Sequence, residues 1–119
     1  MGLLDKLRRK KSPIPPKAPE QTVIVYFRYG STNLERLFAL EDELEAAIAK
    51  SSAGQYDGNE VNVDGSDGFL YMYGPDADLL FRAVQSTLEA CPFMKGANVK
   101  IRYGPPANDV RQREVVIDA

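Results

Sequence analysis

Aromatic and basic residues alternate with apolar ones along three strand-like segments, and they form the candidate surface with the clearest chemistry. Successive side chains of a strand point to opposite faces of the sheet. If Val25, Leu70 and Ile101 face a core, the residues between them share the opposite face. Aromatic rings can stack on bases, and basic side chains can contact phosphate. This surface, called here the open face, is expected to present Tyr26, Arg28, Phe69, Tyr71, Tyr73, Lys100 and Arg102, with Ile24 beside them.

The segment Asp67–Tyr73, DGFLYMY, resembles the third-strand signature of RNA-recognition motifs. Tyr26 stands about where that family has its first-strand aromatic residue. Two departures weaken the match, because Asp67 replaces a phosphate-contacting basic residue and Leu70 replaces a small one. The positions that do match are Gly68, Phe69 and Tyr71.

The distribution of charge favours a protein over a nucleic acid as the occupant of the open face. Residues 1–17 carry six basic residues and one acidic residue, a net charge of +5, whereas residues 18–119 carry nine basic and sixteen acidic residues, a net charge of −7. An acidic body repels phosphate. We therefore expect the C-terminal segment, a protein partner or a second copy in a homodimer to cover this face, with single-stranded RNA or another nucleic acid as the alternative.

Two Tyr-Gly steps, at Gly30 and Gly74, each precede a segment with helical periodicity. The backbone N–H groups at a helix N-terminus can bind an anion. Asp76 and Asp78 already place negative charge at the second step. The first step is therefore the candidate anion site, with simple helix capping as the alternative, and its residues are Ser31, Thr32 and Asn33.

The residue types exclude several kinds of catalysis. The chain has no histidine and one cysteine, so Ser-His and Cys-His nucleophiles are ruled out. A zinc site would have to use carboxylates and Cys91 alone, a poor match to the usual ligands. Cys91 falls on an apolar helical stripe, which predicts a buried and unreactive thiol. We therefore expect a non-enzymatic protein with no catalytic residues, no metal site and no cofactor.

Acidic residues gather in two places, and neither has the pattern of a functional site. Asp57, Glu60, Asp64 and Asp67 lack the order of a calcium-binding loop, and turn formation explains them. In the first predicted helix, adjacent carboxylates are expected to lie around a solvated face. These are Glu41, Asp42, Glu43 and Glu45.

The chain contains a near-repeat, in which VYFRYG precedes one segment with helical periodicity and LYMYG precedes a second. The two units are expected to position the candidate residues named above. The near-repeat predicts an α+β ferredoxin-like βαββαβ sandwich with strand order 4-1-3-2, both helices on one face and an extra C-terminal strand. That last strand either extends the sheet or pairs with another chain. Thr32 and Glu35 predict a capping box at the first helix. The expected strands are 22–29, 59–63 at a sheet edge, 69–73, 99–103 and 113–117; the helices are 32–50 and one between Pro75 and Pro92.

Residues 1–20 are predicted to be a flexible basic arm with a Pro-rich linker, and residues 21–119 the ferredoxin-like domain. The first eleven residues could form a short helix. Leu3, Leu4 and Leu7 beside the basic run 8–11 could make weak contact with an anionic membrane surface. No transmembrane or secretory segment is recognisable, so a cytoplasmic location is expected.

Three motifs, YDGNE at 56–60, YGPDAD at 73–78 and RYG at 102–104, resemble those of a group of small uncharacterised bacterial proteins. The resemblance covers about residues 21–106 and implies a ferredoxin-like fold without implying an activity. The expected function is therefore that of a small cytoplasmic protein acting by protein–protein interaction or self-association, in a regulatory or immunity-type role.

Overall fold

The computed structural model describes residues 6–9, 20–104 and 110–118, and for 6–9 the backbone alone. The described chain is α+β, and none of its helices is both long and apolar enough to cross a membrane. Its elements are β1 (Lys6–Arg9), β2 (Gln21–Arg28), α2 (Glu35–Ser51), β3 (Gln55–Asn62), β4 (Asp67–Gly74), α3 (Ala77–Glu89), the short 3-10 helix η1 (Pro92–Met94), β5 (Asn98–Arg102) and β6 (Gln112–Val116).

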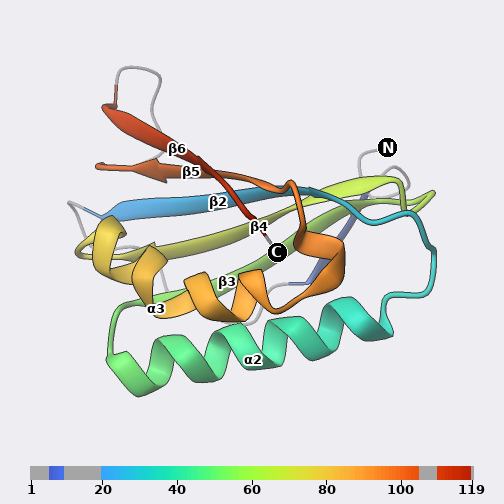
Figure 1. Ribbon diagram of the computed structural model, residues 1–119, viewed down its shortest axis with the longest axis horizontal. Helices are drawn as coiled ribbons and strands as arrows, with labels where there is room; N and C mark the ends of the chain where they lie inside the picture. The colour runs from blue at the N-terminus through green and yellow to red at the C-terminus, as the bar shows by residue number, and fades with distance from the viewer. Residues whose placement is uncertain (1–5, 10–19, 105–109, 119) are drawn as a thin grey trace.

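The described strands form one antiparallel sheet in the order β1-β3-β4-β2-β5-β6. Both α2 and α3 lie against the same side of this sheet (Figure 1). Strands β5, β2, β4 and β3 are therefore neighbours in that order, and the arrangement is compatible with a ferredoxin-like fold. Strand β6 pairs with β5, so the last strand extends the sheet of its own chain.

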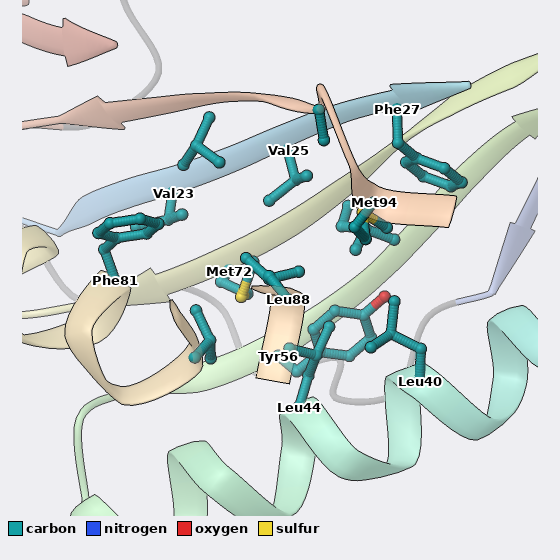
Figure 2. Packing of buried hydrophobic residues seen from close by; sticks show 14 of the residues in the cluster. Val23, Val25, Phe27, Leu40, Leu44, Tyr56, Met72, Phe81, Leu88 and Met94 are labelled. Carbon is teal, nitrogen blue, oxygen red and sulfur yellow. The ribbon is translucent and has the colours of Figure 1, made fainter. Parts of the chain in front are cut away.

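The core fills the space between the sheet and the two helices. From Val23 to Phe27 on β2, buried and half-buried residues alternate, and the buried ones point toward the helices (Figure 2). Each fully buried large apolar side chain contributes about 1.5–3 kcal/mol of transfer free energy. The residues of this layer include Val23, Val25, Phe27, Leu40, Leu44, Tyr56, Met72, Phe81, Leu88 and Met94.

Strand β3 is longer and more central than the sequence predicted. It begins at Gln55 rather than at Asn59, and a β-bulge between Tyr56 and Gly58 interrupts its pairing with β4. The prediction of an edge strand was wrong, because β1 pairs with its other side. The small and polar residues before position 59 suggested a loop, but Tyr56 is only 1% exposed and belongs to the core.

Part of the predicted N-terminal arm lies in the sheet. The backbone of Lys6–Arg9 is a strand rather than part of a helix, and it runs antiparallel to β3 with Lys6 opposite Asn62 and Arg9 opposite Asn59. Residues 1–5 and 10–19 lie outside the described residues. The predicted Pro-rich linker and the membrane contact through Leu3 and Leu4 fall there.

The two helix starts differ in how well the sequence predicted them. The capping box of Thr32 and Glu35 does not form, because α2 begins at Glu35 and its N-cap, Leu34, makes no side-chain cap bond. At α3, the N-cap residue Asp76 has extended backbone angles, and its Oδ1 accepts from the backbone N–H groups of Asp78 and Leu79 at 3.0 and 3.2 Å. The strong cap is therefore at the second helix.

Candidate functional site

The open face brings three aromatic rings together at the centre of the sheet. Tyr26 on β2 is the cross-strand neighbour of Phe69 on β4, and their ring centroids are 5.1 Å apart. Phe69 in turn stacks beside Tyr71, with 6.2 Å between the centroids and 22° between the ring planes. All three side chains are half-buried, and they alternate along β2 and β4 with the core residues Val25, Leu70 and Met72, so they lie on the sheet face opposite to the core. We call them the aromatic cluster.

Both tyrosine hydroxyls of this cluster donate hydrogen bonds to carboxylates. The Tyr26 hydroxyl donates to Oδ2 of Asp67 at 2.6 Å, and Asn62 donates to the other oxygen of Asp67. The Tyr71 hydroxyl donates to Oε1 of Glu60 at 2.5 Å. The hydrogen bond to Asp67 raises the pKa of Tyr26, because the neutral phenol is its donor. The cluster is therefore bordered by negative charge.

The remaining residues of the open face surround this cluster. Tyr73 lies half-buried near the end of β4, and Arg28 and Lys100 are exposed. Arg102 donates through Nη1 to Gln112 on β6 at 2.5 Å. Over strands β2–β6 this face carries three basic residues, Arg28, Lys100 and Arg102, and three acidic residues, Glu60, Asp67 and Glu114. Its net charge over those strands is zero, so it offers no electrostatic attraction to a phosphate chain.

A shallow hollow lies beside the aromatic cluster. Its volume is about 240 Å³, below the range of pockets that enclose a drug-sized ligand. A surface of this shape is suited to packing against another surface more than to enclosing a small molecule. Its lining residues are Ile24, Tyr26, Phe69, Asn98 and Lys100.

The candidate anion site has the geometry of a capped turn. Ser31 Oγ accepts from the backbone N–H of Asn33 at 3.0 Å, and Asn33 Oδ1 accepts from that of Glu35 at 3.0 Å. The N–H of Ser31 donates to the carbonyl of Gly65 at 3.2 Å. Thr32 is exposed between them. These backbone donors already have acceptors within the chain, which favours the capping alternative.

A buried carboxylate is the polar feature that sequence reasoning missed. Glu41 was predicted to lie on a solvated helix face, but it is 0% exposed, so that prediction was wrong. Its Oε2 accepts from the Tyr56 hydroxyl at 2.5 Å and from Asn59 Nδ2 at 2.8 Å. A signal was present, because Glu41 follows Leu37 by four residues and precedes Leu44 by three, which is the spacing of the buried stripe.

The surroundings of the other acidic residues and of the cysteine are typical of residues with a structural role. Asp64 accepts from the backbone N–H of Ser66 at 2.9 Å, which is turn chemistry as predicted, whereas Asp57 lies buried at the bulge of β3. Cys91 follows α3, is half-buried, and burial raises the pKa of its thiol. Within the described residues no three His, Cys, Asp or Glu side chains are grouped to hold a metal ion.

Comparisons of this chain with protein-family models, with curated proteins and with solved structures found no match in any of the three. The geometry of the open face is therefore what bears on function.

Proposed function

We propose that this chain is a small non-enzymatic protein with a ferredoxin-like βαββαβ domain that acts by protein–protein interaction through its open face, in a regulatory or immunity-type role in the cytoplasm. The observation that carries this proposal is the aromatic cluster of Tyr26, Phe69 and Tyr71 on the sheet face opposite to the core. Contiguous aromatic surface of this kind marks interaction sites in soluble proteins.

The surroundings of the cluster favour a protein over a nucleic acid. Single-stranded nucleic acid needs rings that are free to stack and basic groups that follow the phosphates. Here Asp67 and Glu60 accept from the two tyrosine hydroxyls and place negative charge beside the rings. Protein interfaces tolerate such paired polar groups around an aromatic centre. Single-stranded RNA binding is the alternative, supported by the aromatic cluster alone.

A photo-crosslinking experiment tests the proposed function. Phe69 is replaced by the photoreactive benzoylphenylalanine in cells that make the protein, and Phe38, an exposed phenylalanine on α2, serves as the matched control. We expect protein adducts from position 69 and few from position 38. Adducts that nuclease removes would support the RNA alternative. Equal adducts from both positions, or none from position 69, would contradict an interface on the open face.

A binding titration separates the two alternatives directly. We expect no change in fluorescence anisotropy when the protein is added to labelled single-stranded RNA at low salt. If RNA does bind, Tyr71→Ala should weaken binding by roughly 1–3 kcal/mol, and the affinity should fall steeply with added salt.

A further inference from the structure

Charge is divided across the open face between two halves that meet at the aromatic cluster. Among strands β2–β6, the strand order places β3 and β4 on one side of this boundary and β2, β5 and β6 on the other. On β3 and β4, the charged residues of this face are Glu60 and Asp67, both acidic. On β2, β5 and β6, they are three basic residues, Arg28, Lys100 and Arg102, and the acidic Glu114, which lies opposite Lys100. Over strands β2–β6 the first half therefore carries a net charge of −2 and the second a net charge of +2.

The cross-strand register fixes how these groups are spaced. Glu60 lies level with Phe69, Phe69 with Tyr26, and Tyr26 with Asn98. Lys100 lies two residues further along β5, level with Ile24. The acidic Glu60 and the basic Lys100 are thus almost the same distance from the boundary between β2 and β4, on opposite sides of it.

We propose that the open face is a symmetric interface between two copies of this chain, related by a two-fold axis that runs parallel to the strands over the boundary between β2 and β4. Such an axis places the acidic half of each copy on the basic half of the other. Phe69 then lies over Tyr26 of the second copy, and Glu60 comes within reach of the second copy's Lys100 side chain. This dimer rests on the proposed function, since it names the protein that occupies the same face.

Charge selects this axis over the other face-to-face arrangement. A two-fold axis in the plane of the sheet but perpendicular to the strands would place β3 on β3 and β5 on β5. Glu60 would then lie near Glu60 of the second copy, and Lys100 near its Lys100. Like charges opposed across an interface cost several kcal/mol in total. The axis parallel to the strands avoids these contacts and keeps the aromatic clusters in register.

The area of the open face indicates how tightly the two copies of the chain should bind each other. Strands β2–β6, at about 4.8 Å spacing and about 3.3 Å per residue, cover roughly 600 Å² per copy. A standard interface buries about 800 Å² per partner. We therefore expect a dimer that dissociates at micromolar concentration, which sedimentation equilibrium measures between about 1 and 100 µM.

Charge reversal with rescue tests the dimer on the full chain. Glu60→Lys and Lys100→Glu are each expected to weaken self-association about tenfold or more. An equimolar mixture of the two variants, and the variant carrying both changes, should recover the wild-type dissociation constant to within about threefold. The mixed dimer has one native Glu60–Lys100 contact and one with its signs reversed, and the double variant has both contacts reversed. Glu43→Lys and Lys50→Glu, two exposed positions on α2, are the matched controls and should leave self-association unchanged.

Each other outcome overturns a defined part of this inference. A wild-type chain that stays monomeric up to about 100 µM, while position 69 still crosslinks to a different protein, would overturn the dimer and leave the proposed function standing. A monomer with no protein adducts at position 69 would overturn both. The axis along the strands would be overturned if the single reversals weaken association and neither the mixture nor the double variant restores it, although circular dichroism shows these variants to be folded. It would also be overturned if the single reversals have no effect on association.

Discussion

The hydroxyl of Tyr56 donates a 2.5 Å hydrogen bond to Oε2 of Glu41, and both side chains are buried between α2 and β3. Asn59 donates to the same oxygen at 2.8 Å. A carboxylate in a core is costly unless donors replace its water. Tyr56 and Asn59, on either side of the β3 bulge, supply two such donors, so the buried Glu41 ties the position of α2 to the register of β3.

Replacing Tyr56 with Phe should therefore be more damaging than the loss of one hydroxyl suggests. The change removes a donor from a buried carboxylate, so we expect the free energy of unfolding in urea to fall by about 1–3 kcal/mol. Tyr26→Phe is the matched control, because its hydroxyl bonds to Asp67 on the open face, where water can replace it. The control should lose less. Equal losses for the two variants would contradict the stabilising role of the Tyr56–Glu41 bond.

Two glycines with similar backbone angles should respond differently to alanine. Gly30 has φ +84° and Gly65 has φ +75°, so alanine pays the left-handed penalty of about 1 kcal/mol at either position. A Cβ at Gly30 meets nothing within 4 Å, whereas one at Gly65 would overlap the carbonyl oxygen of Ser31. We expect Gly65→Ala to lower the free energy of unfolding at least twice as much as Gly30→Ala. Equal effects would mean that the turn at 64–66 is not packed against Ser31.

Asp78 at the start of α3 should make a pH-dependent contribution to stability. Its Oδ1 accepts from the Tyr103 hydroxyl at 2.8 Å and from Arg113 on β6 at 3.1 Å. Both bonds lower the pKa of Asp78, and the bond from Tyr103 has the larger effect. A lowered pKa in the folded state means that the stabilisation is present above the ordinary carboxyl pKa and is lost as the pH falls through the folded value.

Asp78→Asn should accordingly be less stable than the wild type near neutral pH. The difference in free energy of unfolding should shrink toward zero as the pH is lowered from about 6 to about 2.5. Urea denaturation at several pH values measures it, with Glu43→Gln on the exposed face of α2 as the control. A difference that stays constant with pH would show that Asp78 contributes through helix capping or shape and not through its charge.

Removing residues 1–20 should leave a folded domain with a changed sheet edge. The core between β2, β4, β5 and the helices includes no residue of this segment among its described members. The backbone of β1 pairs with β3, however, so its loss leaves one side of β3 without that partner. We expect the melting temperature to fall by a few degrees, and the amides of residues 59–62 to exchange faster with deuterated solvent. Unchanged exchange at these amides would contradict the pairing of β1.

Local patterns were sufficient for much of the fold. The alternation along β2 and β4 was confirmed, because a two-residue period depends only on strand geometry once one face is buried. The stripe of Leu37, Leu40, Leu44 and Ile48 on α2 was confirmed for the same kind of reason, as a helix repeats every 3.6 residues. Asp76 begins α3 because its carboxylate accepts from the N–H groups of Asp78 and Leu79, two and three residues later in the chain.

Tertiary contacts decided the features that these patterns did not predict. Glu41 is buried because Tyr56 and Asn59, fifteen and eighteen residues later, provide its donors, and a helical pattern does not contain them. The segment before Asn59 is a strand because β4 pairs with it across the bulge. Thr32 does not cap α2, because the chain at Ser31 is held by Gly65 from a distant turn.

On the open face, too, some features follow from the sequence and others depend on tertiary contacts. The sequence by itself determined which residues lie on it, since parity assigns Tyr26, Phe69 and Tyr71 to one side of the sheet. Only the tertiary structure decided that Asp67 accepts from Tyr26, a residue forty-one positions away, and that the half of the face on β3 and β4 is net acidic while the half on β2, β5 and β6 is net basic. The physical reason is that side-chain direction follows from each strand alone, whereas the neighbour of a side chain depends on which strands pair and in which register.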